Sequence, residues 1–199
     1  MRIVILTGSL LIAAAATVGC SRKEATPAAQ DAPSTTASSE PGTTAPAANP
    51  SSGEHRVDIM PGQGGDVAGA VTLVAADGAV TMTGAVTALK PGSEHGFHIH
   101  EKGDCSSPDF KSAGDHFNPT SQAHGDPATS PHHLGDIPNL KADDMGKAAV
   151  NARVEGVTLG DGGPNDLVGR AVVVHADRDD YKTQPSGNSG DRVACGVIK

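Results

Sequence analysis

The sequence predicts an all-β domain, built as a Greek-key β-barrel or sandwich. Short runs rich in β-branched residues recur along the chain, and clusters of glycine, proline, aspartate and asparagine separate them. The Asp77-Gly78 pair lies between two such runs and is a strong hairpin signal. No long segment has the apolar periodicity of a helix. Together these observations favour antiparallel strands joined by turns.

Each of these runs is expected to form one strand. The first alternates apolar and polar residues, the next two flank the hairpin signal, and the later ones are short and rich in valine and isoleucine. In chain order, the expected strands are 56–60, 67–74, 80–86, 96–100, 148–154, 170–175 and 193–198.

The pattern of strands fails between 102 and 140, where glycine, proline, histidine and aspartate dominate. A structureless loop of this length is uncommon in a compact domain unless it has a function. We expect a metal and a disulfide to organise it.

The first 53 residues are expected to lie outside the folded domain. Residues 1–20 combine an early charge, an apolar run and then small residues, as secretory signals do. The Gly19-Cys20 junction resembles a lipoprotein cleavage site, although Thr17 stands where such sites usually carry leucine. We expect Cys20 to be lipidated, with plain secretion as the alternative. Residues 21–53, rich in alanine, threonine, serine and proline, are expected to be a flexible tether before the domain at 54–199.

Charge and cysteine content narrow the class of protein further. Residues 1–53 contain equal numbers of acidic and basic residues, so the domain carries the whole net charge of −8. This charge argues against nucleic acid or anionic lipid as a partner. With Cys20 assigned to lipid, only Cys105 and Cys195 remain, and an oxidising compartment favours a disulfide between them.

The stretch "GFHIHEKGDC" at 96–105 contains the first indication of chemistry. In an extended strand, His98 and His100 leave one face while Phe97 and Ile99 leave the other. Two imidazoles backed by buried apolar side chains are half of a metal site. A surface strand without a metal is the alternative for this pair alone. Four further histidines, at 116, 124, 133 and 175, follow in loops or at a strand end and favour a metal site.

The sequence from about 56 to 199 resembles a copper/zinc superoxide dismutase of the exported bacterial type. Six segments match that family in order and nature: "GFHIHE", "AGDHFNP", "HGDP", "HLGD" at 133–136, "VVVHAD" and "GNSGDRVACGVI". The resemblance implies a Greek-key barrel with long metal-binding and electrostatic loops. It also implies two metal sites that share His116 as a bridge. Copper would be held by His98, His100, His116 and His175, and zinc by His116, His124, His133 and Asp136. His55, His95 and His132 match no ligand position.

The resemblance also implies roles for two residues that are not metal ligands. Asp179 matches an aspartate that joins a copper histidine to a zinc histidine by hydrogen bonds, with Asp180 as the alternative if the register is off by one. Arg192 matches the arginine beside copper, where a permanent charge can attract and orient a small anion. The loop between Cys105 and His116 is longer than in animal members. The segment 180–192 is shorter than theirs, which weakens the expected electrostatic guidance.

The implied activity is dismutation of superoxide to dioxygen and hydrogen peroxide, by a copper centre that alternates between Cu(II) and Cu(I). His116 would carry a proton to the product, and zinc would be structural. A non-enzymatic copper- and zinc-binding envelope protein is the main alternative, and a dizinc hydrolase would need a general base that the sequence does not offer. The expected location is the cell envelope, with the lipid on Cys20 anchoring the protein in a membrane facing the periplasm or the cell surface. The resemblance leaves open whether the chain is a monomer or a homodimer.

Overall fold

The computed structural model describes residues 53–129 and 131–199. The expected leader, Cys20 and all but the last residue of the expected tether lie outside the described residues. Within the described residues, no helix is long and apolar enough to cross a membrane.

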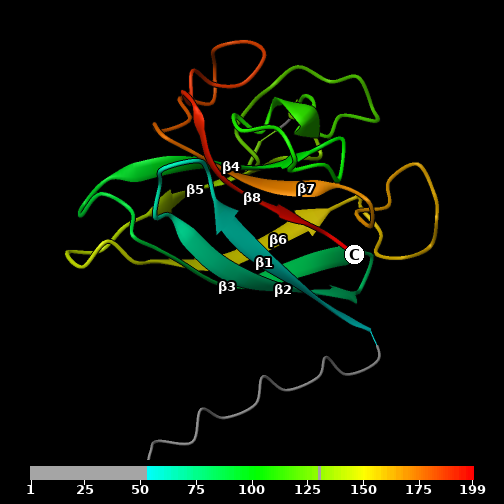
Figure 1. Ribbon diagram of the computed structural model, residues 1–199. Coiled ribbons are helices and arrows are strands. Elements are labelled where there is room, and N and C mark those ends of the chain that lie inside the picture. The colour runs from blue at the N-terminus through cyan, green and yellow to red at the C-terminus, as the bar shows by residue number, and fades with distance from the viewer. Residues whose placement is uncertain (1–52, 130) are drawn as a thin grey trace, which may run out of the picture. The chain divides into compact units, whose positions relative to one another are not determined.

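Eight antiparallel strands form one sheet that curls into a barrel (Figure 1). The hydrogen-bonded order is β5-β4-β7-β8-β1-β2-β3-β6, so several connections pass over neighbouring strands in the Greek-key manner. The all-β prediction is therefore confirmed. The strands are β1 (Glu54–Pro61), β2 (Ala68–Ala76), β3 (Ala79–Thr87), β4 (Glu94–His100), β5 (Asp136–Lys141), β6 (Ala148–Glu155), β7 (Ala171–His175) and β8 (Arg192–Val197).

The hairpin between β2 and β3 forms at the expected pair. Asp77 and Gly78 both have positive φ angles, of 52° and 74°, as a two-residue type I′ turn requires. The register pairs Ala76 with Ala79 directly across the turn. Alternation along β6 buries every second residue, which places one face of the strand against the barrel interior.

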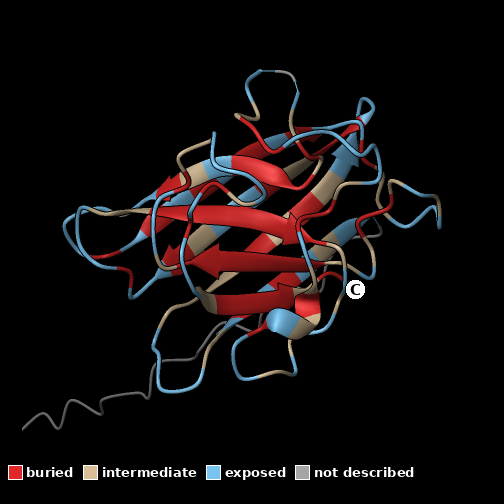
Figure 2. Cartoon of the chain, turned by 90° about the horizontal axis from the view of Figure 1, so that it is seen from above, coloured by how far each residue is buried: buried red, intermediate tan, exposed pale blue. Residues whose placement is uncertain are grey.

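Apolar side chains from all eight strands fill the barrel interior. Figure 2 shows buried residues along the strands and exposed ones mostly in the loops. The largest fully buried ones include Phe97, Ile99, Ile59, Leu73 and Met82. A second, smaller cluster lies on the other side of β7 and β8, where Phe110 packs with Val173 and Cys195. This second cluster joins the loop after β4 to the barrel wall.

One strand was not expected from the sequence. β5 begins within the last residues of the segment predicted to be a loop, and it pairs with β4 along the edge of the sheet. Its pairing with β4 shifts register between His95 and Phe97, so Ile137 and Leu140 are buried without strict alternation. Pro138, which is exposed, is tolerated because β5 is an edge strand. A 3₁₀ turn, η1 (Lys111–Ala113), is a second element that was not expected.

Two long loops lie on the same side of the barrel, above β4 and β7 (Figure 1). Loop 101–135 connects β4 to β5, and loop 176–191 connects β7 to β8. Hydrogen bonds link the two loops through His124 and Gln184. The residues predicted to bind metals lie on these loops and on the strand ends beneath them.

Candidate metal centre

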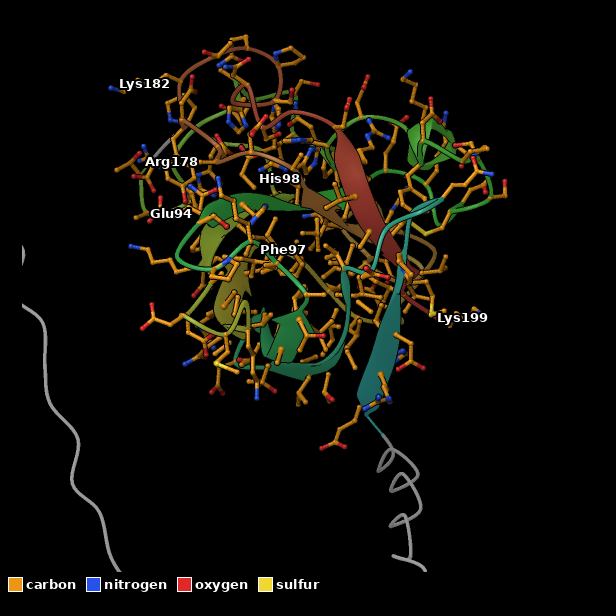
Figure 3. The ribbon with its side chains drawn as sticks, turned by 60° about the vertical axis from the view of Figure 1, so that its left-hand side comes forward. Glu94, Phe97, His98, Arg178, Lys182 and Lys199 are labelled. Atoms are coloured by element: carbon orange, nitrogen blue, oxygen red, sulfur yellow. A yellow bond between two sulfur atoms is a disulfide. The ribbon has the colours of Figure 1, made fainter. Side chains whose placement is uncertain are left out.

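β4 places His98 and His100 on its outer face. Phe97 and Ile99 point into the barrel core, as the alternation predicted. Figure 3 shows His98 and Phe97 on opposite sides of the strand. Both histidines are nonetheless fully buried, because the two loops cover this face of the sheet.

The first cluster consists of His98, His100, His116 and His175, whose nearest ligand atoms all lie within 4.8 Å of one another. His175 ends β7, which pairs with β4, so the sheet itself brings three of these residues together. His116 comes from loop 101–135 and is held against β4 by a bridge to His100.

In the first cluster, one ring nitrogen of each imidazole makes a hydrogen bond to another group of the protein. His98 Nε2 donates to Asp179 Oδ2 at 2.7 Å, and His100 Nδ1 donates to the Gly114 carbonyl at 2.9 Å. His175 Nδ1 lies 3.1 Å from the Ser189 hydroxyl. The other nitrogens of these rings are left for a shared ligand, and two of them, His100 Nε2 and His175 Nε2, are 3.3 Å apart.

The second cluster consists of His116, His124, His133 and Asp136, again with ligand atoms within 4.8 Å. Asp136 begins β5, and its Oδ1 lies 2.8 Å from His116 Nδ1, 3.0 Å from His124 Nδ1 and 3.3 Å from His133 Nδ1. The contact to His124 lacks hydrogen-bond geometry, which leaves that nitrogen unpaired. Asp136 Oδ2 accepts the backbone N–H groups of Gly125 and His133, which fixes the carboxylate.

His116 belongs to both clusters. Its Nδ1 donates to Asp136 in the second cluster, while its Nε2 is buried without a hydrogen-bond partner. His98 Nδ1 and His124 Nδ1 are the other two buried side-chain atoms without a partner in the described residues. Unpaired buried polar atoms are rare in proteins, so three of them among these clustered rings point to bound metal ions.

The Asp179 carboxylate joins the two clusters. Its Oδ2 accepts from His98 and its Oδ1 from His124 Nε2 at 3.0 Å. Asp180 instead caps the turn at Thr183, so it does not take this place. Both contacts of Asp179 fix a ring orientation and leave the opposite nitrogen of the ring for a metal.

Burial determines the protonation of the first cluster. It lowers the pKa of His175 to about 2 and that of His116 to about 4, and it also lowers the pKa of His98 and His100. These rings are therefore neutral at pH 7 and can act as ligands. Burial alone would also lower the pKa of His124, but the nearby carboxylates of Asp136 and Asp179 raise it to about 9. His124 therefore has to lose a proton when a metal binds.

Arg192 at the start of β8 lies beside the first cluster. Its guanidinium donates to the carbonyls of Phe110 and Gly114, both at 2.7 Å. The Gly114 carbonyl also accepts from His100, so one acceptor fixes Arg192 relative to a histidine of the cluster. A cavity of about 570 Å³ opens over Arg192, His100, His116 and His175.

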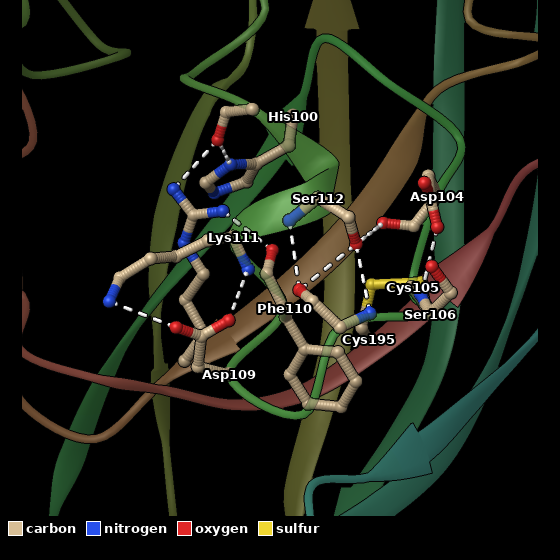
Figure 4. The surroundings of a disulfide bond; sticks show 12 residues. His100, Asp104, Cys105, Ser106, Asp109, Phe110, Lys111, Ser112 and Cys195 are labelled. Carbon is tan, nitrogen blue, oxygen red and sulfur yellow. Dashed lines mark hydrogen bonds and ion pairs between the residues drawn. A yellow bond between two sulfur atoms is a disulfide. The ribbon is translucent and has the colours of Figure 1, made fainter.

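The expected disulfide joins Cys105 to Cys195, with their Cα atoms 5.8 Å apart. It connects loop 101–135 to β8, and Phe110 packs beside it (Figure 4). Phe110 has a positive φ of 56°, and its carbonyl is the one that accepts from Arg192. The longer loop noticed in the sequence therefore supplies both carbonyls that hold the arginine.

A family model for copper/zinc superoxide dismutase matches residues 67–198. The chain belongs to the copper/zinc superoxide dismutase family. It is 43% identical over 138 residues to Cu-Zn superoxide dismutase 2 of Aquifex aeolicus, which covers 68% of this chain and 81% of that relative. It is 44% identical over 113 residues to the superoxide dismutase-like protein YojM of Bacillus subtilis, covering 55% of this chain and 58% of that one.

Solved structures agree with this membership. A crystal structure of a superoxide dismutase-like protein from Bacillus subtilis superposes with a TM-score of 0.67 at 38% identity, covering 73% of this chain and 98% of that one. The clock protein EA4 superposes with a TM-score of 0.65 at 37% identity, covering 73% and 93%. Membership in the copper/zinc superoxide dismutase family implies copper and zinc as cofactors, and the two clusters offer donors suited to both.

The structure of this superoxide dismutase family member also places the histidines that matched no ligand position. His132 contacts the Thr129 carbonyl, and His55 contacts the carbonyl of Lys199. His95 is buried, and its Nδ1 donates to the carbonyl of His175 at 2.9 Å. Sequence reasoning gave no role to His95, Asn139 or Gln184, although all three hold residues of the metal centre. Their partners are 40 to 80 positions away, so no local motif indicates them.

Proposed function

We propose that the protein dismutates superoxide, with copper held by the first cluster and zinc by the second. Copper bound among the four imidazoles would supply reversible one-electron chemistry, so that two superoxide anions and two protons give dioxygen and hydrogen peroxide. The observation that carries the proposal is the position of His116, which offers one nitrogen to each cluster. A histidine shared in this way couples the two metal sites chemically.

Arg192 is proposed to bind and orient the anion. Its side chain is fixed by two carbonyls at the wall of the cavity, and it lies next to His100. The chain is acidic overall, and Glu101 and Asp115 also line the cavity. A fixed guanidinium in a narrow site can still produce a locally positive potential for a small anion.

His116 is proposed to carry the proton that the product needs. Its Nε2 faces the first cluster and has no protein partner, so it can take up a proton and donate it there. The opposite nitrogen, Nδ1, lies 2.8 Å from Asp136 Oδ1 in the second cluster, where a bound zinc would keep the ring in place during this exchange. Asp179 is proposed to orient His98 and His124 at the same time.

Titration of copper into zinc-loaded protein tests the proposal. Superoxide consumption should rise in proportion to bound copper and reach a plateau at one copper per chain. A chain that binds copper with no gain in superoxide consumption would instead favour a non-enzymatic metal-binding protein.

The location and assembly of the protein are also proposals. We infer export to the cell envelope, with lipid on Cys20 as the membrane anchor, from the sequence of residues 1–20. The disulfide of the folded domain supports an oxidising compartment. Mass spectrometry of the mature amino terminus would test lipidation, and sedimentation would distinguish a monomer from a homodimer.

A further inference from the structure

Two side-chain amides hold backbone groups of the metal centre in the same way. Asn139 donates to the Asp179 carbonyl at 2.9 Å and accepts the Asp179 N–H at 3.0 Å. Gln184 donates to the His124 carbonyl at 2.9 Å and accepts the His124 N–H at 2.9 Å. Each amide therefore pairs with both backbone groups of one residue, as a neighbouring strand would.

The two pairings connect three separate parts of the chain. Asn139 belongs to β5 and Asp179 to loop 176–191, whereas Gln184 belongs to loop 176–191 and His124 to loop 101–135. Loop 176–191 is therefore fixed to the sheet through one amide and to loop 101–135 through the other. The Asp179 carboxylate lies between them, in contact with His98 and His124.

The groups around the Asp179 carboxylate are tightly packed, so neither loop backbone can shift there without a clash. Asp179 is fully buried, and a Cβ atom added to Gly187 would lie 1.7 Å from its Oδ1 and 2.7 Å from His124 Nε2. Tyr181 adds two bonds, because its N–H donates to Asp179 Oδ1 at 2.6 Å and its hydroxyl accepts the Asn139 N–H at 2.7 Å. A small shift of either backbone would therefore break the contact between Asp179 and His124.

An ion pair also links loop 176–191 to the sheet, between Arg178 and Glu94 at 2.8 Å (Figure 3). The Arg178 side chain is 61% exposed, and ion pairs so exposed to water contribute little to stability. The amide pairings are thus a stronger restraint on the loop than this ion pair.

We propose that Asn139 and Gln184 are positioning residues that hold Asp179 and His124 in register, so that a single carboxylate can orient a histidine of each cluster. This inference rests on the proposed function where it assigns zinc to the second cluster. Loss of either amide pairing should loosen His124 and weaken zinc retention while leaving the barrel intact.

The test uses the variants Asn139→Leu and Gln184→Met, which keep side-chain size and net charge but remove the hydrogen bonds. Asn165→Leu is the matched control, because Asn165 donates to the Gly156 carbonyl at 2.8 Å in the loop between β6 and β7 and touches neither cluster. Zinc dissociation into excess chelator is measured on zinc-loaded, copper-free protein. Amide hydrogen exchange and melting temperature are measured on the metal-free protein.

Zinc should dissociate about tenfold faster from the two variants than from the wild type, the lower end of the effect of outer partners of metal ligands. The control should stay within about twofold of the wild type. Exchange should accelerate locally, at the Asp179 N–H in Asn139→Leu and at the His124 N–H in Gln184→Met. Equal zinc dissociation rates in variants and control would overturn the proposal, and so would faster exchange spread over the whole barrel.

Gln184 is exposed, so Gln184→Met should fold even if Asn139→Leu does not. None of these measurements uses copper or superoxide. A zinc-loaded chain that lacks dismutase activity would contradict the proposed function and leave this test valid.

Discussion

Replacing Cys105 with serine removes the covalent link between loop 101–135 and β8. The disulfide closes a segment of 90 residues, for which the chain-entropy estimate of stabilisation is about 4 to 5 kcal/mol. For a domain of this size, that loss corresponds to a fall in melting temperature of roughly 10–15 °C.

The same substitution should also affect the metal centre. Phe110 and Gly114 follow Cys105 in the loop, and their carbonyls hold Arg192. His116 lies two residues after Gly114 and is shared by both clusters. We therefore expect weaker zinc binding and lower turnover in Cys105→Ser, even when both metals are saturating.

The assay compares melting temperature, zinc affinity by chelator competition, and metal-saturated superoxide turnover between the wild type and Cys105→Ser. All three quantities should fall. A lower melting temperature with zinc affinity and turnover unchanged would refute the reasoning, because the disulfide would then stabilise the fold without positioning the site.

Three other perturbations follow from the site. His116→Ala should abolish superoxide consumption and weaken the binding of both metals, as measured by metal analysis; loss of copper with normal zinc binding would contradict a shared ligand. Arg192→Glu should slow turnover more at low salt than at high salt, since charges are screened over about 10 Å at 0.1 M; an equal loss at every ionic strength would indicate a structural role. Because the pKa of His124 is raised to about 9, zinc uptake near pH 7 should release a proton, and zinc affinity should rise with pH up to about 9. In the metal-free protein, the raised pKa of His124 means that its protonated form stabilises the folded state. This contribution to the free energy of unfolding is complete below the unfolded pKa of about 6.5 and is lost as pH rises through about 9. Calorimetry in buffers of different ionisation enthalpy would detect the proton, and an affinity independent of pH would count against the protonated His124.

The sequence predicted the strands whose pattern is local. The β2–β3 hairpin followed from one dipeptide, and β4 followed from the alternation of histidines with Phe97 and Ile99. β5 was missed because the register shift in its pairing with β4 removes strict alternation and because Pro138 argues against a strand. The structure of residues 1–52 is not described, so the leader and the lipid on Cys20 stay predictions.

For the metal centre too, the sequence revealed local features and missed the long-range contacts. The His98 and His100 pair was visible from spacing, whereas grouping the histidines into two clusters required the resemblance of six motifs to one family. The restraints on these residues come from Asn139, Gln184 and Phe110, which act through amide or backbone groups. Their roles depend on which distant segments the fold brings together, and no spacing in the sequence encodes that.

The copper and zinc content of protein isolated from its native cell envelope, measured together with superoxide consumption, tests the central claim most directly. We expect one copper and one zinc per chain, with superoxide consumption proportional to the copper. One copper and one zinc without superoxide consumption would contradict it and identify a metal-binding protein without this activity, and two zinc ions without copper would contradict the assignment of the first cluster.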